Sequence, residues 1–426
     1  MISTEELYKI YQRHPSIQTD TRKIQAGDIF FALKGPNFNG NNFAAQALDK
    51  NAAYVIIDEP QPVNSEKVFL VDDVLGTMQQ LAKYHRQALN IPFIAITGSN
   101  GKTTTKELIH AVLSSVYKTY TTKGNLNNHI GIPVTMLQVK KDAEVAVIEM
   151  GANHQNEIAG YCQYVLPTHG IITNAGKAHL EGFGGLEGVR KGKGELYDFL
   201  RTHNGTAVVM WDYEYLREMS AGIKHIVTYG TSNADITGIA LKSEPFLQVE
   251  MKEGFSVKNI STQLVGDYNL PNVLAAIAIG KYFKVPEEKI RVAVGDYTPT
   301  NSRSQLIEKD SNKIILDAYN ANPSSMRAAI ENFSHLPDPN KILILGAMAE
   351  LGNESLQEHQ NIVELIKQYP WKNVALVGGD FLKINHPYLS FENNLQAKEW
   401  MQKQKIRDAS LLIKGSRSME MEKVIL

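Results

Sequence analysis

The sequence predicts an α/β protein of three domains: a small N-terminal α/β domain, a central P-loop domain with a mainly parallel sheet, and a C-terminal Rossmann-like domain. The chain has 426 residues, of which 43% are hydrophobic and 21% charged, as in soluble proteins of several domains. A glycine-rich loop follows an apolar run near residue 93. Short apolar runs alternate with helix-compatible stretches on either side of it, which is typical of parallel sheets covered by helices.

The composition excludes several classes of protein. Lys and Arg total 44 against 45 Asp and Glu, so neither a nucleic acid nor an anionic membrane surface is an expected partner. The single cysteine, Cys162, excludes an internal disulfide and a cysteine-based metal cluster, and we expect it to be a packed small side chain. The N-terminus lacks a signal-peptide pattern, and the longest apolar run, Val273–Ile279, is too short to span a bilayer. We therefore expect a cytoplasmic protein that is not inserted in a membrane.

The first domain is predicted to span residues 1–89. Helices are expected at Thr4–Arg13 and Val74–Ala88. Strands are expected at Asp28–Leu33, Ala53–Ile57 and Val68–Val71. Two polar loops lie between them, at residues 18–22 and 34–43. Both can donate hydrogen bonds to a phosphorylated ligand, but each considered alone is more typical of an ordinary turn.

The second domain, residues 90–298, begins with a strand, a phosphate loop and a helix. The apolar run Phe93–Thr97 leads into the loop, and the helix is expected over Glu107–Tyr117; the loop residues are Gly98, Ser99, Asn100, Gly101, Lys102, Thr103 and Thr104. Backbone N–H groups of such a loop surround phosphate oxygens at a helix N-terminus. Lys102 is expected to reach the β- and γ-phosphates, and Thr103 to bind Mg²⁺. Ile96 replaces the first glycine of the usual motif, so an ordinary glycine-rich turn is the alternative.

Two further strands of this domain end in polar residues. Glu149 follows Val145–Ile148, and the segment 174–181, which includes His179, follows Gly170–Thr173. Carboxyl ends of parallel strands carry ligand sites, so Glu149 and Thr103 are predicted to supply oxygen ligands to Mg²⁺. A capping role for Glu149 and a simple hydrogen-bonded role for His179 are the alternatives, and Lys193 by itself would be a surface lysine. Antiparallel strands are expected within Ile236–Val265, followed by helices at Leu270–Phe283 and Glu287–Val294.

The third domain, residues 299–426, alternates strands and helices as a Rossmann-like unit does. Expected strands are Lys313–Leu316, Lys341–Leu345, Val374–Val377 and Ser410–Ile413, and expected helices are Ser324–Phe333, Leu356–Gln368 and Leu395–Gln404. The glycines between residues 346 and 352 match a dinucleotide fingerprint poorly, so no nicotinamide site is expected there.

Taken together, the motifs resemble the Mur ligase family of ATP-dependent amide-bond-forming enzymes, and the likeness extends over all three domains. It rests on Gly98–Thr103, Glu149–Gly151, Asn174–Gly184 and Lys191–Glu195. Asp317–Met326, Met348–Gly352 and Lys414–Arg417 are similar to the branch that joins D-alanyl-D-alanine to UDP-N-acetylmuramoyl-tripeptide through an acyl phosphate in peptidoglycan synthesis. No Asp-Asn-Pro-Arg motif of the diaminopimelate-adding branch is present.

The resemblance implies a role for each matching residue. Lys102, His179 and Lys193 would be catalytic, with His179 and a carbamylated Lys193 holding a second Mg²⁺ beside the one at Thr103 and Glu149. ATP would also contact Asn269, Asn272, Arg303, Asp317 and Asn322. The UDP moiety would lie at Thr21, Arg22, Asn39 and Gly40, and the tripeptide would pass Asn127 and Asn128. Members of the family are usually monomers, so the resemblance implies a monomer.

Three positions depart from the family pattern, and some questions stay open. Tyr268 and Asn41 stand where histidine is usual, and Ala347 stands where aspartate is common.

The third residue of the tripeptide (lysine or diaminopimelate) and the base that deprotonates the incoming amine are not assigned. A folylpolyglutamate synthase of the same superfamily is the nearest alternative function. A GTPase-type switch is another, but the guanine-reading Asn-Lys-x-Asp motif is missing, since Asn340-Lys341-Ile342 is followed by leucine.

Overall fold

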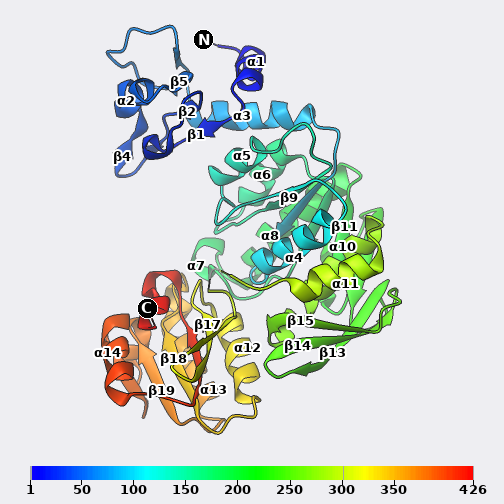
Figure 1. Ribbon diagram of the computed structural model, residues 1–426, viewed down its shortest axis with the longest axis vertical. Helices are drawn as coiled ribbons and strands as arrows, with labels where there is room; N and C mark the ends of the chain where they lie inside the picture. The colour runs from blue at the N-terminus through cyan, green and yellow to red at the C-terminus, as the bar shows by residue number, and fades with distance from the viewer. Residues whose placement is uncertain (1, 301, 426) are drawn as a thin grey trace. The chain divides into compact units, whose positions relative to one another are not determined.

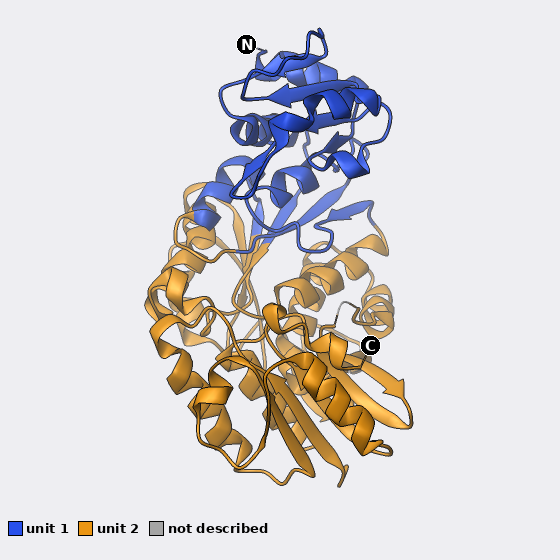
Figure 2. Ribbon diagram, turned by 90° about the vertical axis from the view of Figure 1, so that its left-hand side faces the viewer, with its two compact units in different colours: residues 1–95, 117–151, 157–169 blue, residues 96–116, 152–156, 170–426 orange. Residues whose placement is uncertain are grey.

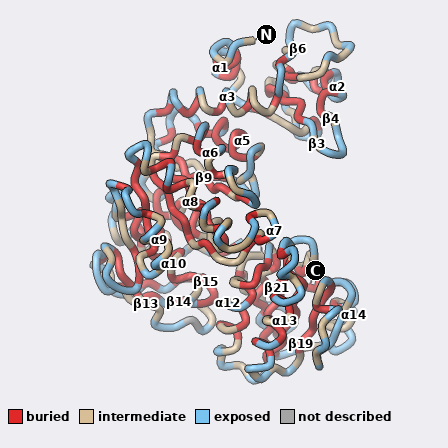
Figure 3. The backbone as a smooth tube through the Cα atoms, turned by 180° about the vertical axis from the view of Figure 1, so that it is seen from behind, coloured by how far each residue is buried: buried red, intermediate tan, exposed pale blue. Residues whose placement is uncertain are grey.

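The computed structural model describes residues 2–300 and 302–425. It contains three β-sheets with accompanying helices, which follow one another along the chain (Figure 1). A separate two-stranded hairpin accompanies the first sheet. Buried residues follow the strands and the inner faces of the helices (Figure 3), because both faces of these sheets carry apolar side chains. The predicted α/β fold class is confirmed.

The N-terminal sheet has four parallel strands in the order β1-β2-β5-β6. They are β1 (Ile17–Gln18), β2 (Ile29–Phe31), β5 (Tyr54–Ile57) and β6 (Val68–Leu70), with the antiparallel hairpin β3 (Lys34–Gly35) and β4 (Phe38–Asn39). The helices are α1 (Thr4–Arg13), α2 (Ala44–Asp49) and α3 (Val74–Gln87), with 3₁₀ turns η1 (Thr21–Lys23) and η2 (Gly40–Phe43). A Ser3–Glu6 capping box fixes the start of α1, and Asp73 caps α3.

The central sheet has nine strands in the order β15-β14-β13-β12-β11-β10-β7-β9-β8. Its strands are β7 (Phe93–Thr97), β8 (Thr119–Thr121), β9 (Val145–Glu149), β10 (His169–Ile172), β11 (Thr206–Met210), β12 (His225–Gly230), β13 (Ile236–Ser243), β14 (Phe246–Glu253) and β15 (Asn259–Val265). The pairs β8–β9, β11–β12 and β12–β13 are parallel, whereas β14 runs antiparallel to both of its neighbours, β13 and β15. The antiparallel strands predicted between residues 236 and 265 are thereby confirmed.

Helices accompany the strands of the central sheet. They are α4 (Lys102–Ser114), α5 (Gly131–Met136), α6 (Glu157–Val165), α7 (Leu180–Phe183), α8 (Leu186–Thr202), α9 (Glu214–Met219), α10 (Leu270–Tyr282) and α11 (Glu287–Asp296), with the 3₁₀ turn η3 (Asp267–Asn269). α10 packs against α4 and is buried along almost its whole length. A helix that is apolar on all sides is expected in such a buried position.

The helix after the phosphate loop differs from the predicted range. We expected it over Glu107–Tyr117, but α4 begins at Lys102 and ends at Ser114. Three successive threonines, residues 103–105, suggest a late start because β-branched residues have low helix propensity. Tertiary contacts outweigh this preference, since Thr105 is buried and its hydroxyl donates to the side-chain oxygen of Asn272 (3.0 Å).

The C-terminal sheet has six strands in the order β16-β17-β21-β18-β19-β20, and every pair but β16–β17 is parallel. Its strands are β16 (Gln305–Lys309), β17 (Asn312–Asp317), β18 (Lys341–Gly346), β19 (Asn373–Val377), β20 (Leu389–Phe391) and β21 (Ser410–Lys414). The helices are α12 (Pro323–Ser334), α13 (Ser355–Ile366) and α14 (Asn394–Gln404), with 3₁₀ turns η4 (Gly352–Glu354), η5 (Gly379–Lys383), η6 (Arg417–Met419) and η7 (Met421–Val424). Helices lie on both sides of this sheet in Figure 1, as predicted for a Rossmann-like unit.

By its internal contacts the chain divides into two compact units (Figure 2). Unit 1 comprises residues 1–95, 117–151 and 157–169, and unit 2 comprises residues 96–116, 152–156 and 170–426. The phosphate loop and the whole C-terminal sheet therefore belong to unit 2, whereas Glu149 belongs to unit 1. Over the part of the chain that is described, none of the helices combines the length and the apolar character that crossing a membrane requires.

Candidate functional site

The loop after β7 can adopt its shape only with glycine at two positions. Gly98 has a φ of +142°, and a Cβ there would lie 2.0 Å from Oγ1 of Thr173. Gly101 has a φ of +80°, and a Cβ there would lie 2.5 Å from Oδ1 of Asn272. Both values of φ lie in the region that side chains disfavour. The loop thus brings its backbone to the first turn of α4, where N–H groups bind anions.

The Lys102 side chain folds back over this loop. Its Nζ donates to the carbonyl oxygens of Gly98 (2.6 Å) and Ser99 (3.2 Å). Thr103 is buried in the first turn of α4, and Thr104 beside it is partly exposed. The Lys102 amine is therefore held against the backbone of the phosphate loop.

A second loop, residues 174–178, is hydrogen-bonded along the phosphate loop. The N–H of Ser99 donates to the carbonyl of Asn174 (2.9 Å), and the N–H of Asn100 donates to Oδ1 of Asn174 (3.0 Å). The Ser99 hydroxyl donates to the carbonyl of Gly176 (2.8 Å). His179 follows directly, with a left-handed φ of +51°, at the start of α7. The sequence predicted His179 near the phosphate loop, and these bonds connect the two segments.

A contact from the C-terminal part of the chain reaches His179. Its Nδ1 lies 2.6 Å from Oε2 of Glu350, and this close contact with His179 lowers the pKa of the Glu350 carboxyl. Nearby, Nζ of Lys177 pairs with Glu358 (2.5 Å). Neither glutamate was predicted as a site residue. The Met348–Gly352 motif contains Glu350 and was the one signal that could have found it.

Glu149 ends β9 as a fully buried carboxylate. Nδ2 of Asn127 donates to its Oε1 (2.8 Å), and the backbone N–H of Glu149 donates to the hydroxyl of Thr122 (3.0 Å). Asn127, predicted to contact substrate, is thus also the partner of the predicted metal ligand. Asn128 is exposed, and its Oδ1 accepts the N–H groups of Ile130 (3.2 Å) and Gly131 (2.8 Å).

Glu149 in unit 1 and Thr103 in unit 2 each carry an oxygen donor of the kind that Mg²⁺ takes together with waters and phosphate oxygens. Glu149 offers a carboxylate and Thr103 a hydroxyl. Among the described residues, no group of three or more His, Cys, Asp or Glu side chains is close enough to hold a metal alone. An ion that completes its shell with nucleotide oxygens needs no such group.

Lys193 is a buried residue of α8, and its reading as a surface lysine was wrong. It is 1% exposed; Nζ donates to the carbonyl of Ala152 (3.0 Å) and lies 4.8 Å from the ring centroid of Phe183. No helix was predicted over residues 186–202, where the structure has α8. Packing of the α8 apolar face, which includes Val189 and Leu196, buries the lysine between them.

Asn269 and Asn272 form a buried amide pair at the start of α10. Nδ2 of Asn272 donates to Oδ1 of Asn269 (2.8 Å), and Nδ2 of Asn269 donates to the carbonyl of Val265 (2.8 Å). Oδ1 of Asn272 accepts the hydroxyl of Thr105 on α4. The pair therefore ties η3 to the helix that carries the phosphate loop.

The three residues expected from the third domain occupy different environments. Nδ2 of Asn322, the N-cap of α12, donates to Oδ1 of Asn100 in the phosphate loop (2.7 Å). Asp317 pairs with the buried Nζ of Lys414 (2.5 Å). The Arg303 guanidinium stacks on the ring of Tyr319 with Cζ 3.6 Å from its centroid. The structure thus brings Asn322 to the phosphate loop.

Unit 1 contains the residues predicted for the UDP moiety. Thr21 is buried at the start of η1, while the Arg22 side chain is 87% exposed and pairs with Asp20 (2.8 Å). Hydrogen bonds from Arg22 lower the pKa of Asp20 to about 2. Gly40 begins η2, immediately after Asn39. Arg22 is therefore the one cation of this set, and most of its side chain is exposed.

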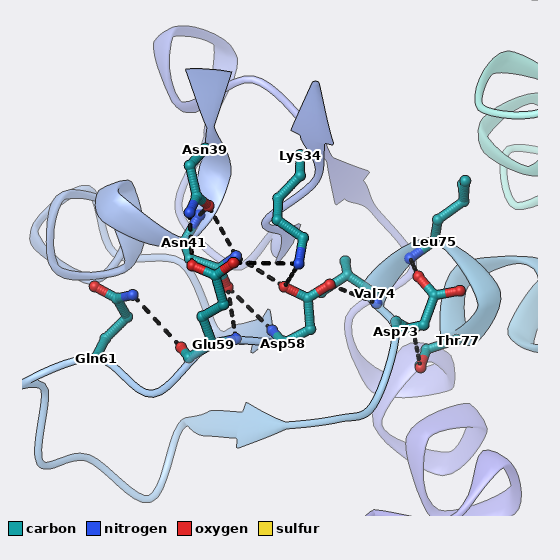
Figure 4. Close-up of polar contacts among 10 residues, drawn as sticks. All are labelled: Lys34, Asn39, Asn41, Asp58, Glu59, Gln61, Asp73, Val74, Leu75 and Thr77. Carbon is teal, nitrogen blue, oxygen red and sulfur yellow. Dashed lines mark hydrogen bonds and ion pairs between the residues drawn. The ribbon is translucent and has the colours of Figure 1, made fainter. Parts of the chain in front are cut away.

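Asn41, which stands where histidine is usual in the family, belongs to a buried hydrogen-bond network (Figure 4). It is fully buried, its Nδ2 donates to Asp58 Oδ1 (2.8 Å), and its Oδ1 accepts the N–H of Asp58 (3.0 Å). Lys34 lies 3.2 Å from both Asp58 and Glu59, and Asn39 donates to Glu59 (2.6 Å). Burial opposes the effect, but bonds from Asn41 and Lys34 lower the pKa of Asp58. Asn41 thus cross-links its loop to the end of β5.

Models of three protein domains match the chain. The "Mur ligase family, catalytic domain" matches residues 15–96, the "Mur ligase middle domain" residues 96–280, and the "Mur ligase, glutamate ligase domain" residues 302–415. Full-length relatives are similar as well. The UDP-N-acetylmuramoyl-tripeptide–D-alanyl-D-alanine ligase of Bacillus subtilis is 35% identical, and that of Escherichia coli 33%; each match covers 96% of this chain and 92% of the relative.

Solved structures show the same similarity. MurF from Acinetobacter baumannii has a TM-score of 0.88 at 30% identity, covering 98% of this chain and 97% of that one. MurF ligase from Thermotoga maritima in complex with ADP has a TM-score of 0.87 at 25% identity, covering 96% of each chain. A folylpolyglutamate synthase from Thermotoga maritima is 13% identical with a TM-score of 0.62 over 82% of this chain and 91% of that one, so it shares the fold alone.

Proposed function

Because the chain belongs to the Mur ligase family, we propose that it is the ATP-dependent ligase that joins D-alanyl-D-alanine to UDP-N-acetylmuramoyl-tripeptide. The products are the UDP-linked pentapeptide, ADP and phosphate, in peptidoglycan synthesis. One observation carries the proposal: the likeness to relatives named for this activity extends over nearly the whole of both chains. The Asp317–Met326 motif and the Asn322 contact to the phosphate loop support it.

The proposed reaction has two steps. The terminal carboxylate of the tripeptide attacks the γ-phosphorus of ATP, giving an acyl phosphate and ADP. The free amine of D-alanyl-D-alanine then attacks the activated carbonyl carbon, and phosphate leaves from the tetrahedral intermediate. The first step is needed because a carboxylate is a poor electrophile. Lys102 would turn from its loop carbonyls to the phosphate oxygens and stabilise the charge that develops there.

We assign the nucleotide contacts by position in the fold. The loop from Gly98 to Thr104 would surround the phosphates, and the Asn269–Asn272 pair would shape the adenine end. Arg303, Asp317 and Asn322 would approach ATP from the third domain. Within unit 2 the Asn100–Asn322 bond already joins the phosphate loop to α12, which supports an ATP position between these segments. Closure there would keep water from the acyl phosphate.

The residues present fit Mg²⁺ as the metal. Thr103 and Glu149 would hold one ion, and His179 with a carbamylated Lys193 would hold a second; such ions neutralise charge on the transferring phosphoryl group. Carbamylation joins the neutral Lys193 amine to CO₂ and releases a proton, so a cation becomes a carboxylate-like ligand. An ammonium at this buried position would repel the metal ion, whereas a carbamate supplies the oxygen ligands that Mg²⁺ prefers.

The remaining assignments concern substrate and organisation. Thr21, Arg22, Asn39 and Gly40 would hold the UDP moiety, and Asn127 and Asn128 would lie along the tripeptide. We assign the domains to residues 1–89, 90–298 and 299–426, acting as a monomer in the cytoplasm, where ATP and UDP-linked precursors are available. The base that accepts the amine proton is left unassigned.

The test is ADP release measured with UDP-N-acetylmuramoyl-tripeptide and D-alanyl-D-alanine, each omitted in turn. ADP release that depends on both substrates supports the proposal. Stimulation by folate and glutamate instead would replace it with the folylpolyglutamate synthase alternative. ADP release that no acceptor changes would indicate a nucleotide-dependent switch. Lysine- and diaminopimelate-containing tripeptides should be compared in the same assay, because the motifs do not distinguish them.

A further inference from the structure

A line of hydrogen bonds within unit 2 connects η3 to the C-terminal sheet. The Tyr268 hydroxyl donates to the Ser304 hydroxyl oxygen (2.9 Å). The Ser304 N–H donates to Oδ1 of Asp317 (3.1 Å), and the Lys414 ammonium donates to the other oxygen of that carboxylate (2.5 Å). Lys414 also donates to the carbonyl of Asn320 (3.2 Å). The Asp317 carboxylate is therefore held on both of its oxygens.

The local backbone is built to place the Tyr268 ring. Gly266 has a φ of +91°, and a Cβ there would lie 2.3 Å from Cε1 of Tyr268, so the ring occupies space that only glycine leaves free. Ser304 is buried and held at a left-handed φ of +49°, which is uncommon for a residue with a side chain. Burial raises the pKa of Tyr268 far above its usual range. Its hydroxyl thus stays protonated and acts as a donor at neutral pH.

The same turn is anchored to the phosphate-loop helix. Asn269, next to Tyr268, accepts a hydrogen bond from Asn272, which in turn accepts one from Thr105 on α4. Tyr268 therefore lies between two segments that have separate places in the proposed nucleotide site. On one side is the amide pair at the adenine end, and on the other is Asp317, which approaches from the third domain.

We propose that Tyr268 is a positioning residue for the nucleotide: its hydroxyl fixes Ser304, and through it the Asp317 carboxylate, relative to the adenine end of the site. This inference rests on the proposed function only in placing ATP between the Asn269–Asn272 pair and Asp317. Removing the hydroxyl leaves the ring and every other contact in place. Nucleotide binding then loses the alignment of Asp317, whereas binding of the UDP-linked substrate in unit 1 does not depend on it.

The test is the dissociation constant for ADP, measured by calorimetry with Mg²⁺, in Tyr268→Phe and in Tyr84→Phe as the control. Tyr84 is in unit 1, and its ring packs against that of Tyr8 with an interplanar angle of 49°. One hydrogen bond contributes about a 3- to 10-fold factor. Tyr268→Phe should weaken ADP binding by about that factor, and Tyr84→Phe should leave it unchanged. In the ligase assay, the KM for ATP should rise while the KM for the UDP-tripeptide stays constant.

A second variant makes the test independent of Tyr268 itself. Ser304→Gly removes the accepting hydroxyl and is compatible with the left-handed backbone. Both substitutions remove the same hydrogen bond, the one between the Tyr268 and Ser304 hydroxyls. The double variant should therefore bind ADP no more weakly than the weaker-binding single variant. Unchanged ADP affinity in both single variants would overturn the proposal. So would a double variant whose ADP affinity falls by a factor equal to the product of the two single-variant factors. If the wild type binds ADP but no acceptor supports its release, the proposed function fails while this test remains valid.

Discussion

Lys193 shows how the environment of one side chain can reverse what its type suggests. Lysine is among the residues least often buried, yet Nζ of Lys193 has a protein carbonyl and an aromatic ring as its neighbours. Both neighbours suit an ammonium group, since the carbonyl accepts its hydrogen bond and the ring face attracts a cation, whereas a carbamate would bring oxygen atoms to the site. Removal of the side chain should therefore be more damaging than removal of an exposed lysine of the same helix.

We expect Lys193→Ala to lose most ligase activity and to recover part of it when a short carboxylic acid such as acetate is added, because the acid can supply the missing oxygen atoms. Lys191→Ala is the matched control, since Lys191 is exposed on α8, and it should retain activity without any response to acetate. ADP formation measured across an acetate titration checks both. Wild-type activity in Lys193→Ala, or loss that no acid restores, would contradict the carbamate.

Asn127 provides a second prediction at this scale. Its amide donates to the Glu149 carboxylate (2.8 Å), so Asn127→Ala leaves that oxygen without its donor. Loss of such an orienting partner typically costs 10- to 100-fold in metal affinity. We expect the Mg²⁺ concentration for half-maximal ADP formation to rise by about tenfold. Asn125→Ala, which removes an exposed side chain in the same loop, should leave the Mg²⁺ requirement unchanged; an equal shift in both variants would rule out orientation of Glu149.

The residues that could be predicted from sequence are those whose geometry is local. Gly98 to Thr103 form their loop from consecutive backbone, so the order of residue types is sufficient. Glu350, Glu358 and the Glu149 partner Asn127 act through contacts between segments far apart in the chain. No periodicity or spacing encodes such contacts. The burial of Lys193 was missed for the same reason, because the α8 face that carries it packs against residues outside the helix, among them Phe183 and Ala152.

At the scale of elements, α3 holds unit 1 together. It packs against α1, α5 and α6, and Arg86 near its end caps the C-terminus of α6. The guanidinium donates to the carbonyls of Val165 (3.0 Å), Leu166 (3.0 Å) and Leu89 (2.8 Å), and stacks on Phe93. Burial lowers the pKa of Arg86 to about 10, so it remains charged at neutral pH. Such a cation satisfies the last carbonyls of a helix and its dipole.

Arg86→Met should destabilise the protein by about 2–4 kcal/mol, because methionine keeps the apolar stem but leaves buried carbonyls without donors. Gln87→Met is the control: it changes the next, exposed residue of α3 and should shift the free energy of unfolding by less than about 0.5 kcal/mol. Denaturant unfolding of both variants measures the difference. Equal midpoints would show that the cap contributes nothing.

At the scale of the whole molecule, buried histidines connect stability to pH in both units. Burial lowers the pKa of His85 and His169 in unit 1 and of His359 in unit 2; that of His169 falls to about 4. His169 begins β10 and has the Thr168 hydroxyl beside its Nδ1 (2.8 Å). Each ring is therefore neutral in the folded protein at a pH where the unfolded chain already binds a proton.

The sign of the effect follows from this difference. Since the folded pKa lies below the unfolded value of 6.5, the contribution of His169 is complete above pH 6.5 and is lost as the pH falls toward 4, to a total of about 3 kcal/mol. His169→Gln should flatten the decline in unfolding midpoint between about pH 7.5 and about pH 5. His129→Gln, at an exposed position, should follow the wild-type curve. If His169→Gln declined as steeply as the wild type, protonation of this ring would not be a source of acid instability.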